Sequence, residues 1–135
     1  MIEAFIDTSF AVALGNNKDS YHQKALELSF LMSGASLITT DCILYEIGNS
    51  LARGFREHAV ATISNLITSD EIEVVKTDNI LFDRAFELYK SHNDKTWGLV
   101  DCVSFVVMTD RGVAKALSND RHFRQAGFEA LLRTD

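Results

Sequence analysis

Short apolar runs alternate along the chain with longer segments in which apolar residues recur at helical spacing. The short runs predict strands that are buried on both faces of a sheet, and the longer segments predict helices with one apolar side. Strands are predicted at residues 2–6, 36–39, 72–75 and 113–117, with a fifth candidate at 128–132. Helices are predicted at residues 8–14, 19–32, 41–53, 57–68, 78–91, 99–108 and 121–126.

Polar residues with short side chains stand where several of these helices begin. Thr8 or Ser9 is predicted to cap the first helix, because a side-chain oxygen there can accept a hydrogen bond from the first turn. Asp41 and Asp78 are predicted to cap two later helices in the same way. Strands that alternate with helices predict an α/β fold around a mainly parallel sheet, since parallel neighbours need helical crossovers.

Composition narrows the class of protein. The chain has 135 residues and no proline, and neither a repeat nor a low-complexity tract interrupts it, so residues 1–135 are predicted to form one domain. It lacks an apolar run of about 20 residues and an export signal at residues 1–5, which predicts a cytoplasmic protein. Cys42 and Cys102 are too few for a disulfide framework and are interpreted as reduced thiols.

The net charge of -6 argues against a protein that holds nucleic acid through a broad basic surface. An acidic chain can still meet a polyanion locally where clustered carboxylates bind metal cations, because the ions supply the positive charge. Two acids stand where such a cluster is expected: Asp7 follows the first strand and Asp120 follows the strand ending at Leu117. Ligands of α/β folds bind at the carboxyl ends of strands. The alternative is that each is an ordinary turn or cap residue.

Two further acids lie in helical segments. Asp101 interrupts the apolar segment 97–108, and a buried carboxylate needs a cation, a hydrogen-bond donor or a helix start beside it. Glu46, Asn49 and Arg53 share one face of the helix predicted at 41–53. This polar row is either a solvated surface or a carboxylate with an amide and a guanidinium that can contact phosphate.

The four acids at positions 7, 46, 101 and 120 occur in an order that resembles the PIN-domain ribonucleases, particularly the VapC-type toxins of prokaryotic toxin–antitoxin pairs. The residues that carry the resemblance are 6–9, 44–47 with Asn49 and Leu51, 99–105, and 116–123 followed by Gly127 and Phe128. Two positions depart from the pattern. Gly98 stands where the family often has a hydroxyl residue, and Asn119 replaces an aromatic or aliphatic residue before the fourth acid.

The resemblance implies a PIN-like three-layer sandwich with four to five short strands, and an endoribonuclease that hydrolyses RNA at a four-carboxylate site. Oxygen ligands suit Mg²⁺, with Mn²⁺ as the alternative. The implied metal ligands and catalytic residues are Asp7, Glu46, Asp101 and Asp120, and the products carry a 5'-phosphate and a 3'-hydroxyl. Candidate substrate-binding residues are Thr8, Ser9, Asn49, Arg53 and Arg121.

The resemblance also implies partners: a homodimer and a small antitoxin protein that covers the acidic site. It leaves open which RNA is cut and whether one or two ions bind. The alternative function is a catalytically weak PIN-like module that binds RNA or assembles with proteins. His122 is interpreted as part of a surface turn that Phe123 anchors in the core, with a general-base role as the alternative. Trp97 is interpreted as a core or interface residue, with stacking on a base as the alternative.

Overall fold

Five parallel strands form a central sheet in the computed structural model, which describes residues 1–133. The strands are β1 (Ile2–Ile6), β2 (Ser36–Thr40), β3 (Ile72–Val75), β4 (Lys115–Leu117) and β5 (Glu129–Ala130), in the order β3-β2-β1-β4-β5. β1 is the middle strand, and its last three residues are all buried. Successive side chains point to opposite faces of a sheet, so this burial shows that both faces are covered.

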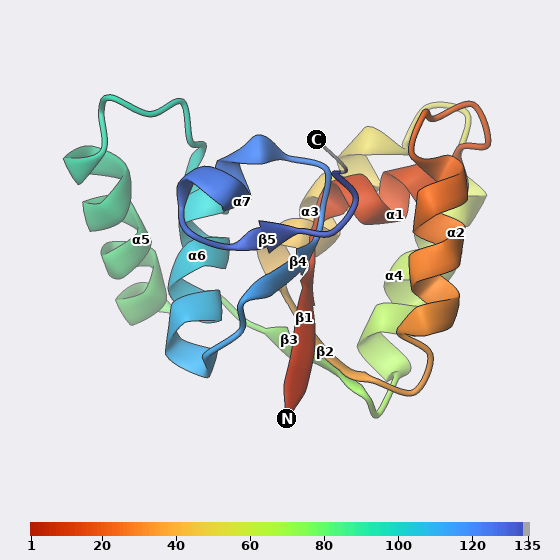
Figure 1. The fold of residues 1–135 in the computed structure, drawn as a ribbon, viewed down its shortest axis with the longest axis horizontal. Helices are drawn as coiled ribbons and strands as arrows, with labels where there is room; N and C mark the ends of the chain where they lie inside the picture. Colours follow the sequence, from red (N-terminus) through yellow and green to blue (C-terminus); the bar gives the residue numbers. More distant parts are fainter. Residues whose placement is uncertain (134–135) are drawn as a thin grey trace.

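Helices cover the two faces of the sheet. They are α1 (Thr8–Gly15), α2 (His22–Leu31), α3 (Asp41–Ser50), α4 (Arg56–Thr68), α5 (Asn79–Ser91), α6 (Leu99–Arg111) and α7 (Arg121–Gln125). Figure 1 shows α5 and α6 on one side of the strands and α1, α2 and α4 on the other. This arrangement confirms the predicted α/β fold with a parallel sheet flanked by helices.

Helix α6 is the most buried helix near the sheet. All residues from Cys102 to Met108 are buried, because α6 contacts α5 on one side and β1 on the other. Phe105 packs edge-on against both Trp97 and Phe123, with ring centroids 5.1 and 5.2 Å apart. The core interpretation of Trp97 is therefore correct, since its side chain is buried.

Three predicted helix caps have different outcomes. Asp78 caps α5 as predicted, because its side chain accepts from the backbone N–H of Leu81 at 2.8 Å. The prediction for Asp41 was wrong: Thr40 caps α3, and Asp41 instead accepts from the hydroxyl of Thr77 at 2.7 Å. The contact with Thr77 holds the segment after β3 against the start of α3.

The cap predicted for α1 was also wrong. Asp7 occupies the N-cap position, and the hydroxyls of Thr8 and Ser9 bond to side chains instead. A residue at the cap position has extended backbone angles, and those of Asp7, φ -99° and ψ 160°, continue the direction of β1. The first acid is thereby placed at the junction between the central strand and the first helix.

Several element ends differ from the predicted ones. The helix predicted at 41–53 ends at Ser50, followed by a turn, and the helix predicted from residue 19 begins at His22. The turn before α2 forms because Asp19 accepts from the backbone N–H of Tyr21 at 2.8 Å. α6 extends to Arg111 and stops where Gly112 takes a left-handed φ of 65°. β4 and β5 are shorter than predicted.

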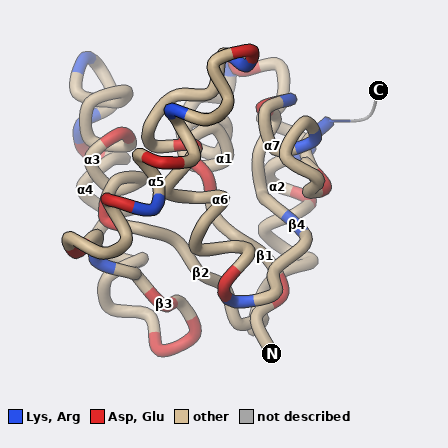
Figure 2. The backbone as a smooth tube through the Cα atoms, turned by 90° about the vertical axis from the view of Figure 1, so that its left-hand side faces the viewer, with Lys and Arg blue, Asp and Glu red and all other residues tan. Residues whose placement is uncertain are grey.

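Charge is distributed over the whole described fold. Figure 2 shows Lys and Arg positions interspersed with Asp and Glu positions along the backbone. The two-point ion pairs Arg84–Asp110 and Arg111–Glu73 account for two of the basic groups on the α5 and α6 side. In residues 1–133, no helix is long and apolar enough to cross a membrane.

Candidate active site

The four acids singled out in the sequence line one open pocket with a volume of about 620 Å³. Asp7 follows β1 directly, and Asp120 follows β4, which pairs with β1. Asp101 lies in the first turn of α6 and Glu46 lies within α3. Because β1 and β4 are parallel neighbours, their carboxyl ends bring Asp7 and Asp120 to the same edge of the sheet.

Asp7 is the buried member of this group, with 8% of its surface exposed. Its Oδ2 accepts a hydrogen bond from the hydroxyl of Ser118 at 2.6 Å and lies 3.2 Å from the hydroxyl of Ser9. Burial raises the pKa of Asp7 to about 6, with the negative charge of Asp101 adding to it, although the bond from Ser118 acts in the opposite direction. The ionised form of Asp7 is therefore costly unless a cation lies beside it.

Two serine hydroxyls connect Asp7 to the segment after β4. Ser118 Oγ accepts from the backbone N–H of Asp120 at 2.9 Å, and Ser9 Oγ accepts from that of Asn119 at 3.0 Å. The two hydroxyl oxygens are 3.2 Å apart. This network sets the position of the fourth acid relative to the first. Ser118 was not singled out in the sequence, although it lies between the strand that ends at Leu117 and the acid Asp120; its position in that segment was the available signal.

Glu46 is held by a residue of another helix. The hydroxyl of Thr8 donates to Glu46 Oε1 at 2.6 Å. Ser50, one turn after Glu46, also lines the pocket, whereas Asn49 and Arg53 do not. Arg53 lies beyond the end of α3, so the polar row predicted on this helix is interrupted before it. Asn49 and Arg53 are exposed outside the pocket lining.

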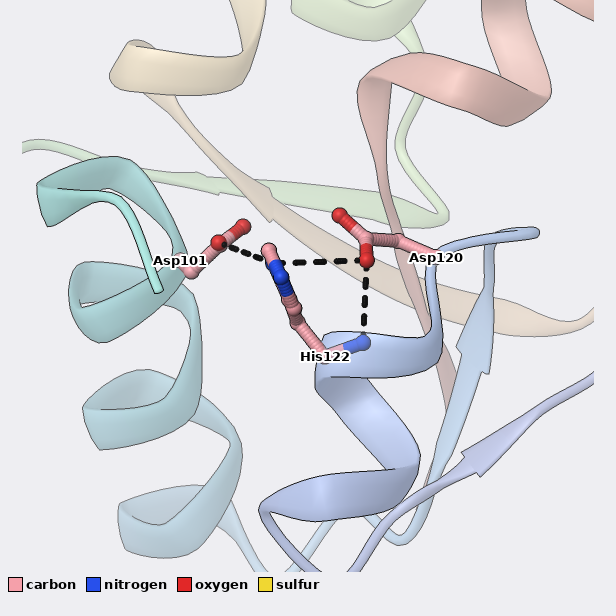
Figure 3. Close-up of side chains that lie close together, drawn as sticks. All are labelled: Asp101, Asp120 and His122. Atoms are coloured by element: carbon pink, nitrogen blue, oxygen red, sulfur yellow. Dashed lines mark hydrogen bonds and ion pairs between the residues drawn. The ribbon is translucent and has the colours of Figure 1, made fainter. Parts of the chain in front are cut away.

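Asp101, Asp120 and His122 lie close enough together in the pocket to share a metal ion (Figure 3). His122 Nδ1 lies 2.9 Å from Asp101 Oδ2 and 3.3 Å from Asp120 Oδ1. One ligand atom from each of the three residues lies within 4.8 Å of the other two. The sequence interpretation of His122 as a surface-turn residue was therefore incomplete, although Phe123 is buried in the core as expected.

The alternative roles that the sequence suggested for Asp101 and Asp120, at a helix start and as a helix cap, are also present. Asp101 Oδ2 accepts from the backbone N–H of Gly98 at 3.0 Å, and Asp120 caps α7 by accepting from the N–H of His122 at 2.9 Å. Gly98 has no side chain to offer, and its backbone N–H supplies the donor to Asp101. Capping and membership of the acidic pocket are thus compatible, because the oxygen of each carboxylate that accepts the backbone N–H also faces His122 Nδ1, and a carboxylate oxygen has more than one lone pair.

The pocket can hold a divalent cation. Its donors are carboxylate oxygens with one ring nitrogen beside them, and the buried carboxylate of Asp7 carries charge that a cation would offset. Further lining residues that the sequence interpretation missed are Asp19, Ser50 and Val12. Arg121 is exposed at the start of α7, next to Asp120 in the chain but outside the pocket lining.

Known proteins share the sequence pattern and the fold of this chain. The model of the PIN domain family matches residues 4–129. A curated relative, the 23S rRNA-specific endonuclease VapC20 of Mycobacterium tuberculosis, is 34% identical over 126 residues, covering 92% of this chain and 94% of the relative. The crystal structure of Mycobacterium tuberculosis VapC20, described as a sarcin–ricin loop cleaving toxin, superposes with a TM-score of 0.84 at 30% identity and covers 93% of this chain and 96% of that one.

A more distant structure shares the fold. VapBC2 from Rickettsia felis, solved bound to a DNA fragment from its promoter, matches with a TM-score of 0.65 and 14% identity, and the match covers 96% of this chain and 97% of that one. The family resemblance inferred from the residues is confirmed by the family match and by VapC20. This chain belongs to the PIN domain family.

Proposed function

We propose that this chain is a divalent-metal-dependent endoribonuclease whose active site is the pocket lined by Asp7, Glu46, Asp101 and Asp120. The observation that carries the proposal is the convergence of these carboxylates from four separate segments at the carboxyl edge of a parallel sheet. Such clustering costs free energy in the absence of a cation, because like charges repel in a partly buried site. The 34% identity to an endonuclease over 92% of the chain supports the same conclusion.

The donor set fits Mg²⁺ or Mn²⁺, which bind carboxylate oxygens and retain several waters. Asp7, Asp101 and Asp120 would hold the ion, with Glu46 binding it directly or through water. When bound, the ion supplies positive charge for the attacked phosphate and activates a water molecule. Removal of the ion is therefore expected to abolish hydrolysis.

The hydroxyls near the acids position them. Thr8 donates to Glu46 and Ser118 donates to Asp7, so each carboxylate is held in one orientation before substrate arrives. Ser9 lies within 3.2 Å of Asp7 and Ser118, which makes it part of the same network. The roles of Thr8 and Ser9 are then mainly to orient the acids.

Exposed polar residues that neighbour the acids in the chain are the candidate substrate contacts. Arg121 follows Asp120, and Asn49 and Arg53 follow Glu46; all three are exposed outside the pocket lining, and side chains of these types contact phosphate without reading sequence. Basic and acidic groups are interspersed over the fold (Figure 2), so an RNA strand is held locally beside the site. We propose a stem-loop of the large ribosomal RNA as substrate, because the relative VapC20 is a 23S rRNA-specific endonuclease.

The test is cleavage of an end-labelled stem-loop from 23S rRNA by purified protein with Mg²⁺ or Mn²⁺. Asp7→Asn and Asp101→Asn are expected to lose activity by about 100-fold or more, because a metal ion contributes several kcal/mol to catalysis. Asp70→Asn is the matched control, since Asp70 is exposed outside the pocket. Chelation should also stop cleavage, and products should carry a 5'-phosphate. Equal cleavage by all variants would reveal a contaminating nuclease and reject the proposal.

We further propose that the chain is the toxin of a toxin–antitoxin pair, that it forms a homodimer and that a small antitoxin protein binds it. Exposed aromatic side chains support protein interfaces: Phe82, Phe86 and Tyr89 stack along α5 with ring centroids 6.0 and 6.5 Å apart. Growth arrest on expression, reversed by co-expression of a small neighbouring reading frame but absent for Asp7→Asn, tests the pairing. Light scattering after size exclusion tests the dimer, and a monomeric mass would contradict it.

A further inference from the structure

We propose that His122 supplies a ring-nitrogen ligand to the cation held by Asp101 and Asp120, so that the site prefers a divalent transition-metal ion to Mg²⁺. The inference rests on the proposed nuclease function and adds to it the identity of a ligand and the class of ion. It starts from the close group in Figure 3, where the imidazole of His122 lies between the two carboxylates.

Two of the three donor spacings match those of neighbouring ligands around one ion, and the third pair, the oxygens of Asp101 and Asp120, lies within 4.8 Å. In an octahedral site with bonds of about 2.1 Å, adjacent ligand atoms lie about 3 Å apart. His122 Nδ1 is 2.9 Å from Asp101 Oδ2 and 3.3 Å from Asp120 Oδ1. A cation can therefore bind all three atoms after small side-chain rotations, without movement of the helices that carry them.

The backbone also directs His122 toward the acids. Asp120 Oδ1 accepts from the backbone N–H of His122 at 2.9 Å, which sets the first turn of α7 beside that carboxylate. Asp101 comes from the start of α6, on the other side of the imidazole, and is oriented by the N–H of Gly98. The imidazole is thus positioned by two separate helices, and 18% of the surface of the His122 side chain is exposed.

The second ring nitrogen has the partner that a metal-binding histidine needs. His122 Nε2 lies 3.1 Å from the hydroxyl oxygen of Thr96. With its proton on Nε2 donated to Thr96, the ring presents the Nδ1 lone pair to the site between Asp101 and Asp120. Histidines that bind metals almost always donate the other ring N–H to an oxygen acceptor, most often a carboxylate, a backbone carbonyl or water, and the Thr96 hydroxyl takes that place here.

A nitrogen ligand changes the selectivity of the site. Mg²⁺ favours oxygen ligands and loses water reluctantly, whereas transition-metal ions accept imidazole. The alternative role for His122 is positioning, in which Nδ1–H donates to the carboxylates and does not contact the ion. Both roles affect cleavage, so activity cannot separate them, but only direct coordination couples the nitrogen to the electron spin of Mn²⁺.

The decisive experiment is pulsed electron paramagnetic resonance of the whole protein loaded with Mn²⁺. We expect nitrogen modulation from a directly bound imidazole in the wild type and its loss in His122→Gln. His92→Gln is the matched control and should keep the signal, because His92 stacks on Trp97 outside the pocket. If wild-type protein binds Mn²⁺ without nitrogen modulation, the role of His122 as a ligand is rejected while the nuclease proposal stands.

Calorimetric titration with Mn²⁺ and Mg²⁺ provides the second readout. His122→Gln should weaken Mn²⁺ binding by about tenfold or more, because even outer partners of a metal contribute about that factor, and should weaken Mg²⁺ less. Thr96→Val should weaken Mn²⁺ more mildly and keep the nitrogen signal. An equal loss for both ions would overturn the selectivity argument. If neither ion binds the wild type, the proposed metal-dependent function itself fails.

Discussion

The hydroxyl of Thr8 donates a hydrogen bond to Glu46 Oε1 at 2.6 Å, which joins two helices through residues 38 positions apart. Thr8 begins α1 directly after Asp7, so the same junction that places the first acid also orients the second. A short hydrogen bond to an ionised carboxylate is stronger than one between neutral groups. Glu46 is therefore held toward the pocket by its partner in α1.

Thr8→Val should lower the rate of RNA cleavage by about tenfold or more, because the valine fills the same volume but leaves Glu46 without its donor. Thr8→Ser keeps a hydroxyl and should recover most of the rate. The measurement is kcat and KM with the labelled stem-loop, with circular dichroism to verify folding. A Thr8→Val enzyme with unchanged kcat would show that Glu46 does not depend on this bond.

Ser118→Ala should reduce the free energy of unfolding by about 1–3 kcal/mol, because the backbone N–H of Asp120 loses a buried acceptor. It should also raise the pKa of Asp7 beyond about 6, since the hydrogen bond from Ser118 lowers it. Mn²⁺ binding then requires a higher pH than in the wild type. Urea unfolding and metal titrations across pH test both effects.

Ser104→Ala is the control for Ser118→Ala, because Ser104 is a buried serine whose hydroxyl bonds to the carbonyl of Val100 within its own helix. It should leave the pH dependence of metal binding unchanged. A similar shift in both variants would indicate a general loss of packing and contradict a specific effect on Asp7.

Asp7→Asn should stabilise the metal-free protein at neutral pH. Burial raises the pKa of Asp7 from 3.8 to about 6, so the folded state binds the proton more tightly than the unfolded chain. The contribution of Asp7 to stability is then present below about pH 4 and is lost as pH rises through about 6, with a total of about 3 kcal/mol. The variant has no charge to bury and avoids this loss.

The measurement is urea unfolding of wild type and Asp7→Asn with chelator at about pH 7.5 and about pH 4. The stability advantage of the variant should be largest at the higher pH and should vanish at the lower one. Added Mn²⁺ should narrow the advantage at the higher pH, because the ion binds only the folded wild type tightly. A constant difference at both pH values would contradict the assigned burial effect.

Gly15→Ala should destabilise the contact between α1 and α4. A Cβ at Gly15 would lie 2.1 Å from Cδ2 of His58, whose Nε2 is 3.3 Å from the carbonyl oxygen of Ala11. Overpacking of this kind costs about 1–3 kcal/mol. In a His58→Ala background the same change should cost much less, which thermal or urea unfolding of the four proteins in the cycle will show. Additive effects would mean that the ring and Gly15 do not restrict each other.

Hydrophobic spacing carried most of the information on the fold. The strands at Ile2–Ile6 and Ile72–Val75 lie where the apolar runs predict them, and Asp78 caps α5 as predicted. These features depend on residues within about one turn or strand of each other, so the local pattern suffices to predict them. The four acids were singled out because Asp7 and Asp120 follow strands and the other two lie in helical segments, and their order along the chain then resembled that of a known family.

Helix ends and helix caps were predicted less well where residues distant in the sequence compete for the same side chains. Asp41 has a good capping side chain, but Thr77 engages it across 36 positions and leaves the cap to Thr40. Arg53 shares the helical period of Glu46, yet the helix ends at Ser50 and the period no longer applies. A local preference worth about 1 kcal/mol is easily outweighed by contacts between elements.

The local sequence pattern thus predicted the alternating strands and helices and identified the candidate carboxylates. Only the tertiary structure decided which residues contact each carboxylate: Ser118 bonds to Asp7 across 111 positions, and His122 contacts Asp101 across 21. The physical reason is that burial and backbone preference are encoded by nearby residues, whereas a hydrogen bond between side chains depends on how whole strands and helices register and pack.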